Sequence, residues 1–296
     1  MKKIMQSLIS LLIIAVIASC SGNPFMTNIF GGIDNYSLPD SFDNVDDILD
    51  EAGDDGFLDA LADNPELADD VIDILEASLP EDAADADSDD QEAALLLADV
   101  HLATTEADET INNVNDLLTG FIAGDEGEDS PDMDDPASII PDLFVLDETL
   151  TPAEQQTAVE EQLAAFLAAA DALEFYGDTI VAGQDPSSEV NPGETAATAM
   201  ISGMTAFIIQ NMDTSSIDPD IVAANPGATD DELAIAALAD VIVNGSDMPD
   251  IGDPTYENGD PLPDDATTEE YINVILGDGL AEVVGQGFDL SSFENM

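Results

Sequence analysis

Residues 151–181, TPAEQQTAVEEQLAAFLAAADALEFYGDTIV, contain the longest helical pattern of the chain. Thr151 and Glu154 match the two ends of a helix-capping box, and Pro152 stands at the first helical position, where proline is favoured. Apolar residues then recur every three or four positions, which places them on one face of a helix: Val159, Leu163, Phe166, Leu167, Ala170 and Leu173. The stretch therefore predicts one long amphipathic helix that reaches toward Val181.

Helical patterns also lie on both sides of this stretch. Asn64 and Pro65 occupy the N-cap and first positions of one predicted helix. The predicted helices cover residues 66–79, 90–103, 111–122, 191–208, 230–243 and 268–284, the last weakened by Gly277 and Gly279. The second and third of these are separated by a brief polar break and predict an αα-hairpin. No run of alternating β-branched residues demands a sheet, so the predicted fold is all-α, an irregular helical bundle or a short solenoid of αα-hairpins.

Two long loops interrupt these helices. An acidic, proline-containing loop over 125–136 is followed by a short apolar stretch over 139–146. The acidic all-α domain that we predict over 45–296 therefore has a point of subdivision near 125–150. A second loop, 245–265, is rich in Pro, Gly and Asp, and loops of that length are often functional or mobile.

The charge of the chain is almost entirely of one sign. The sequence has 67 Asp plus Glu against 2 Lys plus Arg, a formal net charge of -65. The two bases are Lys2 and Lys3, so His101 is the one remaining side chain that can become cationic. Hydrophobic residues nevertheless make up 45% of the sequence and the mean hydropathy is +0.04, whereas disordered chains combine high charge with low hydrophobicity. We expect a folded core of Leu, Ile, Val and Ala.

The amino terminus has the pattern of an export signal. Lys2 and Lys3 precede an apolar run over 8–17, which is too short for a stable membrane span. The run ends in Ile17-Ala18-Ser19-Cys20, and Cys20 is the single cysteine of the chain. This sequence resembles the lipobox of bacterial lipoprotein precursors. Cleavage by an ordinary signal peptidase, with Cys20 incidental, is the alternative.

The lipobox resemblance implies a lipid-anchored envelope protein. Residues 1–19 would be the cleaved signal peptide, Cys20 the diacylated residue, and 20–44 an irregular lipidated tether. Because residues 1–19 hold both lysines and no carboxylate, their removal takes the formal charge from -65 to -67. The membrane is then reached through the N-terminal lipid, on the periplasmic or extracellular side, and Ser21 is compatible with outer-membrane sorting in a Gram-negative cell.

Paired helices joined by short loops are similar to those of tetratricopeptide-like proteins. Within 90–122, Ala98 matches the small position of the first repeat helix and Leu102 its large position. The alanine of the second helix is not where the repeat requires it, and no second copy follows at a period of about 34 residues. Acidic helical envelope lipoproteins are a further, general resemblance.

The residue inventory excludes most enzyme chemistry. Without Lys or Arg after residue 3, the body offers no Schiff base, no Walker lysine and no arginine clamp for phosphate. No Gly-x-Ser-x-Gly elbow accompanies His101, which we expect to be partly buried and hydrogen-bonded to a neighbour such as Asp99 or Glu106. Nucleic acid is excluded as a partner because phosphates must be neutralised by cations. The sequence thus predicts a protein that is not an enzyme.

Cation binding is the chemistry that remains open. Asp85, Asp87, Asp89 and Asp90 are spaced like the first ligands of an EF-hand loop. Asp90 replaces the glycine of the sixth position, however, and Leu96 replaces the glutamate of the twelfth. The alternative is a solvated turn that caps the following helix. No cofactor is predicted beyond weakly bound Ca²⁺ or other cations.

These observations give three functional hypotheses. The first is a non-catalytic, lipid-anchored envelope protein of a halophilic bacterium, acting as an interaction or solute-capture accessory scaffold for other envelope proteins. The second is a surface protein that binds divalent cations or basic ligands. The third is a carboxylate-based hydrolase, which needs two acids at a defined separation in a cleft.

Salt dependence separates a hypersaline source from an acidic one. Repulsion among ionised carboxylates destabilises the compact state, and dissolved salt screens it. We expect the thermal midpoint at neutral pH to rise from dilute buffer to molar NaCl. An unchanged midpoint would contradict the halophilic hypothesis and favour an acidic medium, in which protonation removes the charge near a pH of about 4.

Overall fold

The computed structural model describes residues 38–39, 41–54, 56–105, 107, 110–111, 144, 149–187, 190–255, 262–263 and 266–287. Within these residues it has nine α-helices, two short 3-10 helices and no strand, which confirms the all-α prediction. The first helices are α2 (Val45–Ala52), α3 (Phe57–Ala62), α4 (Pro65–Ser78), η2 (Ala83–Asp85) and α5 (Ser88–Ala103). The others are α8 (Pro152–Val181), α9 (Pro192–Gln210), η4 (Thr214–Ser216), α10 (Pro219–Ala224), α11 (Asp230–Asn244) and α12 (Thr268–Gly287).

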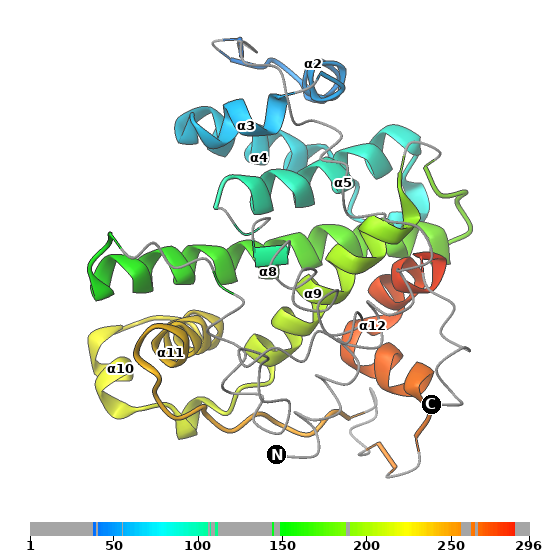
Figure 1. Ribbon diagram of the computed structural model, residues 1–296. Helices are drawn as coiled ribbons and strands as arrows, with labels where there is room; N and C mark the ends of the chain where they lie inside the picture. The colour runs from blue at the N-terminus through cyan, green and yellow to red at the C-terminus, as the bar shows by residue number, and fades with distance from the viewer. Residues whose placement is uncertain are drawn as a thin grey trace, which may run out of the picture.

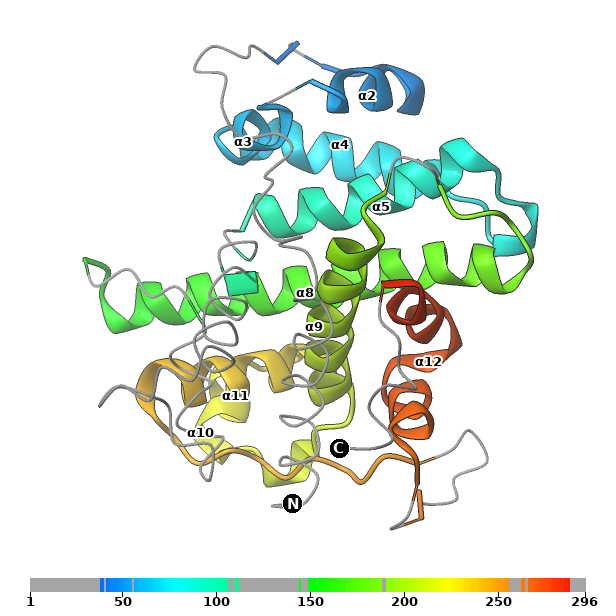
Figure 2. The same ribbon diagram turned by 45° about the vertical axis from the view of Figure 1, so that its right-hand side comes forward.

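Helix α8 is the central element of an irregular bundle. Its 30 residues span about 45 Å at 1.5 Å per residue. The stack of α2, α3, α4 and α5 lies on one side of α8, whereas α11 and α12 lie on the other, and α9 crosses α8 (Figures 1 and 2). Four long helices, α5, α9, α11 and α12, pack directly against it. No helix in the described residues is both long and apolar enough to cross a bilayer.

The capping box at the start of α8 forms as predicted. Thr151 Oγ1 accepts a hydrogen bond from the Glu154 N–H (3.4 Å), and the Glu154 carboxylate accepts one from the Thr151 N–H (2.8 Å). These bonds satisfy backbone donors that a helix start otherwise leaves unpaired. Asp87 with Asp90 caps α5 in the same way, and Thr229 with Glu232 caps α11.

The buried surface of α8 is wider than a single stripe. The predicted apolar positions are buried except Leu167, which is half-buried. Ala165, Ala169, Ala172 and Tyr176 are buried as well. The reason is that packed helices cover α8 on two sides, so small residues between the large ones also face protein. A one-sided amphipathic pattern underestimates the burial of such a helix.

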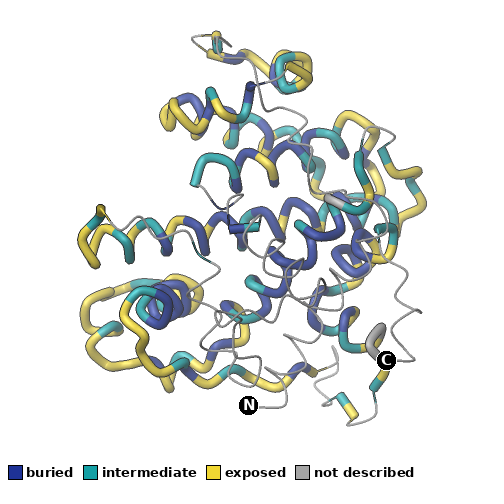
Figure 3. Tube along the Cα trace, viewed as in Figure 1, coloured by how far each residue is buried: buried dark blue, intermediate teal, exposed yellow. Residues whose placement is uncertain are grey.

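Two hydrophobic clusters meet at α8. The larger joins α2, α3, α4 and α5 to the middle of α8, α9 and α12. The smaller joins the start of α8 to the end of α9 and to α11, with Val159 and Leu163 at its centre. Buried residues are concentrated where α5, α8, α9 and α12 come together (Figure 3). Helix α8 thus contributes to both hydrophobic clusters and connects the helices that pack on either side of it.

Several predicted boundaries are confirmed and others shift. Pro65 begins α4 as predicted, although the side chain of Asn64 makes no capping hydrogen bond. Helix α5 begins at Ser88, before the predicted start, because Asp87 provides the cap. The short helices α2, α3 and α10 were not predicted. Helices α3 and α10 have six residues each, too few to show a helical period. The eight residues of α2 do carry apolar side chains at helical spacing, so this helix could have been predicted from the sequence.

Other predictions fall largely outside the described residues. They are the signal peptide with Cys20, most of the 20–44 tether, most of the predicted 111–122 helix, the 125–136 loop and most of the 139–146 stretch. The first part of the 245–265 loop is described and is bound to the end of α9. The Asp213 N–H donates to the Asp250 carbonyl oxygen (2.7 Å), and the Gly252 N–H donates to the Asn211 carbonyl oxygen (2.8 Å).

Helices α8, α9 and α12 approach one another through glycines. A Cβ atom added to Gly177 of α8 would collide with the backbone of Gly279 in α12. One added to Gly203 of α9 would lie 2.7 Å from Leu276 Cδ2. The expectation that Gly279 weakens the helix therefore misses its role, which is to let two backbones touch. Gly285, on the same helix, has open space around it.

Alanine substitutions test this contact. Gly177→Ala should lower the free energy of unfolding by about 1–3 kcal/mol, the usual cost of overpacking. The matched control Gly285→Ala should leave it unchanged or raise it by up to about 1 kcal/mol through better helix propensity. Both are measured by urea unfolding at one fixed salt concentration. Equal effects of the two substitutions would contradict the close approach.

Candidate functional site

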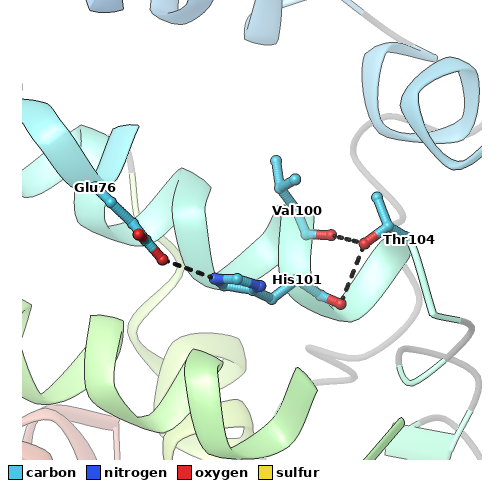
Figure 4. Close-up of polar contacts among 4 residues, drawn as sticks. All are labelled: Glu76, Val100, His101 and Thr104. Carbon is cyan, nitrogen blue, oxygen red and sulfur yellow. Dashed lines mark hydrogen bonds and ion pairs between the residues drawn. The ribbon is translucent and has the colours of Figure 1, made fainter. Parts of the chain in front are cut away.

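His101 lies in the last turn of α5 and faces α4. Its Nε2 atom is 4.0 Å from a carboxylate oxygen of Glu76, and the two side chains are 15% and 57% exposed. Figure 4 shows the imidazole and this carboxylate pointing toward each other. The partial burial was predicted. The acidic neighbour Glu76 on α4 was not predicted, because the prediction considered residues close in sequence, namely Asp99 and Glu106. Glu106 lies outside the described residues.

Burial decides the protonation of His101. Removal from water disfavours the imidazolium and lowers the pKa of His101 from its ordinary value of 6.5. Glu76 does not offset this effect, since its carboxylate is mostly in water, where attraction at 4 Å is small. The imidazole is therefore neutral at neutral pH, and it adds no positive charge to the body.

The described residues around His101 offer it no nucleophile. Thr104 Oγ1 donates to the Val100 carbonyl oxygen (2.7 Å), and Thr105 Oγ1 donates to the His101 carbonyl oxygen (3.0 Å). Both hydroxyls thus satisfy backbone groups at the end of α5, as Figure 4 shows for Thr104. Among the described residues, no hydroxyl or thiol is hydrogen-bonded to the imidazole ring. This geometry fits a structural histidine.

Three carboxylates form a row along one edge of α8. Asp171, Glu174 and Asp178 are spaced so that they lie near one another on the helix. Asp171 and Glu174 are exposed and Asp178 is half-buried, yet the packed helices remove part of the water around each carboxylate, and this partial desolvation is the main reason that the pKa of each is raised. Neighbouring charges add to the effect: Asp231 acts on Asp171, and Asp278 acts on Asp178.

Neutral polar pairs are buried between α5, the residues that follow it, and α8. Gln91 Nε2 donates to Thr179 Oγ1 (2.7 Å), and Thr110 Oγ1 donates to Gln162 Oε1 (3.0 Å). A buried polar group must find a partner, so these pairs favour one register of the helices. Ser202 of α9 is fully buried, and its hydroxyl has no partner among the described residues. No local pattern in the sequence predicts these pairings.

The four predicted cation ligands act in helix capping and surface turns. Asp87 accepts from the N–H groups of Asp89 and Asp90, and Asp90 accepts from the N–H of Asp87. Asp85 closes the short η2 helix and is exposed, as is Asp89. In the described part of the chain, no three His, Cys, Asp or Glu side chains gather in a way that could hold a metal ion. Calcium binding by these four residues stays a prediction.

A small hollow lies beside the carboxyl-terminal part of α8. It is lined by Tyr176, Thr195, Val283 and residues close to them, and its volume is about 20 Å³. Ligand pockets usually measure about 300–1,000 Å³, so this hollow is smaller than a typical small-molecule site. Comparisons with protein-family models, curated proteins and solved structures give no match for the chain.

The pH dependence of stability tests the assignment of His101. Because its pKa is lowered by folding, the unfolded chain binds this proton more tightly, and stability is lost as pH falls below 6.5. His101→Gln removes this loss. Relative to the variant, the natural chain should become less stable between about pH 7.5 and about pH 5, as measured by urea unfolding in constant NaCl. A stability difference that does not change with pH would contradict the assignment.

Proposed function

We propose that the chain is a non-catalytic, lipid-anchored envelope protein of a halophilic bacterium, whose acidic helical body acts as an accessory scaffold for interaction or solute capture. The observation that carries this proposal is the distribution of charge. After Cys20 the sequence has no Lys or Arg, and burial keeps its single histidine neutral. The body therefore presents negative charge to whatever it meets.

The anchor follows from the residues before the body. The apolar run ending in Ile17-Ala18-Ser19-Cys20 places a single cysteine where lipoproteins carry their lipid. Two or three acyl chains on Cys20 hold a protein stably on a membrane, whereas one does so only marginally. Direct adsorption of the body to anionic headgroups is disfavoured by its charge. The lipid is thus the means of attachment, and the outer membrane is the site in a Gram-negative cell.

The arrangement of acids supports a scaffold over a hydrolase. A carboxylate-based hydrolase needs two acids whose environments push their pKa values apart. In the α8 row, the pKa values of Asp171, Glu174 and Asp178 are all raised, and for the same main reason, burial. Because the three shifts have the same direction and the same main cause, they do not favour an acid and base pair of that kind. The imidazole of His101 also has no nucleophile bound to it among the described residues.

Binding of cations or basic ligands is the second candidate. It is favoured by one observation: the α8 carboxylates face other carboxylates, Asp231 and Asp278, with no lysine or arginine on the described helices to balance them. Calorimetric titration with Ca²⁺ separates the two functions. Saturable binding that survives molar NaCl favours dedicated sites, whereas binding abolished by that salt reflects only the overall charge.

Lipidation at Cys20 tests the proposal. Cells that express the chain and are fed radioactive palmitate should label it, and the labelled protein should sediment with membranes. Cys20→Ala should abolish both, because no other cysteine exists. Ser19→Ala is the matched control, since it keeps a small residue before the cysteine and should be labelled normally. Unlabelled protein released in soluble form by the natural sequence would overturn the anchor.

A further inference from the structure

The end of α11 carries an asparagine followed directly by a glycine. Asn244 is the last residue of the helix, and Gly245, with φ 67°, ends it in the left-handed conformation that favours glycine. Both residues are exposed, as is Ser246. Asparagine is one of the thermolabile residues of proteins, and a glycine after it leaves the next backbone nitrogen without a side chain to shield it. An intramolecular reaction of the Asn244 amide therefore meets little steric hindrance here.

The reaction that this pair permits is deamidation. The backbone nitrogen of Gly245 loses its proton to hydroxide and attacks Cγ, the side-chain carbonyl carbon of Asn244. A bond forms between these two atoms while the bond from Cγ to Nδ2 breaks, and the amide nitrogen leaves as ammonia after taking a proton from water. The remaining five-membered succinimide ring is opened by water at one of its two carbonyls, which gives aspartate or isoaspartate. Only water and hydroxide are consumed.

Hydrogen bonds in the folded chain hold the reacting atoms apart. The Gly245 N–H donates to the Val241 carbonyl oxygen (3.0 Å), so the attacking nitrogen is part of the last helical turn. Asn244 Nδ2 donates to one carboxylate oxygen of Asp240 (2.7 Å), which turns the side-chain amide back along the helix and away from Gly245. Ser246 Oγ donates to the other carboxylate oxygen. Asp240 is thus tied to residues on both sides of the glycine.

Charge at the end of α11 hinders the same step. Removal of the proton from the Gly245 nitrogen creates a negative charge, and the carbonyl end of a helix already carries partial negative charge. The carboxylate of Asp240 lies beside the amide, and the exposed Asp247 follows two residues after the glycine. No Lys or Arg after Lys3 can offset these charges. Geometry and charge therefore act in the same direction.

We propose that Asn244 is a deamidation site that the last turn of α11 keeps closed and that reacts when this turn opens. Local opening of a helix end needs less free energy than global unfolding, so the site is reached in the native state. The product then keeps the turn open. Aspartate or isoaspartate at 244 adds negative charge at the unfavourable end of the helix dipole and four residues from Asp240, so repulsion replaces a hydrogen bond.

Mass spectrometry of the full-length chain, purified in detergent, measures the modification. The chain is incubated in mildly alkaline buffer and cleaved at acidic residues, and the peptide that contains Asn244 is scored for replacement of the amide NH₂ by OH. The reaction should be at least several-fold slower in the folded chain than in urea at the same NaCl concentration. Asn258, the other asparagine followed by glycine, should match Asn244 in urea and serves as the reference there.

Paired substitutions separate the hydrogen bond from the overall charge. Asp240→Ala removes the acceptor of the Asn244 amide and should speed deamidation of the folded chain several-fold. The control Asp247→Ala removes an equal charge near Gly245, leaves this acceptor in place, and should have a smaller effect. Rates are compared in NaCl at which both variants keep the far-UV circular dichroism of the natural chain. Equal effects of the two substitutions, equal rates in the folded chain and in urea, or an unreacted Asn244 in urea would overturn the proposal.

The effect of the product is tested with a stable mimic. Asn244→Asp introduces the charge, whereas the matched control Asn244→Ala removes the same donor without adding charge. Hydrogen exchange of the Gly245 amide, corrected for intrinsic rates, reports opening of the last turn. Exchange should be several-fold faster in the aspartate variant than in the alanine variant. Equal exchange would contradict the claim that the modification keeps the turn open.

Discussion

The structure depends on one constraint: its carboxylates have no lysine or arginine within the body to pair with. Cohesion therefore comes from apolar burial around α8, where two hydrophobic clusters meet. Several acids accept hydrogen bonds from backbone N–H groups at helix starts, where the helix dipole also favours negative charge. Asp87, Glu154 and Glu232 are such acids. At the other ends of the described helices, the single basic residue in a last turn is His101 of α5.

The carboxylates consequently fall into two groups with opposite effects on stability. Hydrogen bonds received at helix starts lower the pKa of Glu154, Asp213 and Glu232. The stability that these three carboxylates contribute is therefore present above their ordinary pKa values and is lost as pH falls. Burial raises the pKa of the acids along α8, and stability there is lost as pH rises. A surface that looks uniform in composition is therefore not uniform in its response to acid. A carboxylate that is hydrogen-bonded at a helix start belongs to the first group, and one that packed helices desolvate belongs to the second.

Local signals in the sequence predict the helices, while tertiary contacts require the structure. Thr151 and Glu154 act within one turn, so the start of α8 could be read directly. Gly277 and Gly279 were read as weak points, which is correct for the break at Gly277. The close contact of Gly279 depends on a partner in α8, and no sequence period reveals it. The same holds for Glu76 beside His101 and for the pairing of Gln91 with Thr179.

The central claim is that position in the fold, and not the shared negative charge, sets the ionisation of each acid. Site-resolved NMR titration of the side-chain carboxyl carbons in constant NaCl tests it most directly. The account predicts that Glu154, Asp213 and Glu232 titrate below the ordinary range, and that Asp171, Glu174 and Asp178 titrate above it. A single broad transition shared by all six carboxyl groups would contradict it.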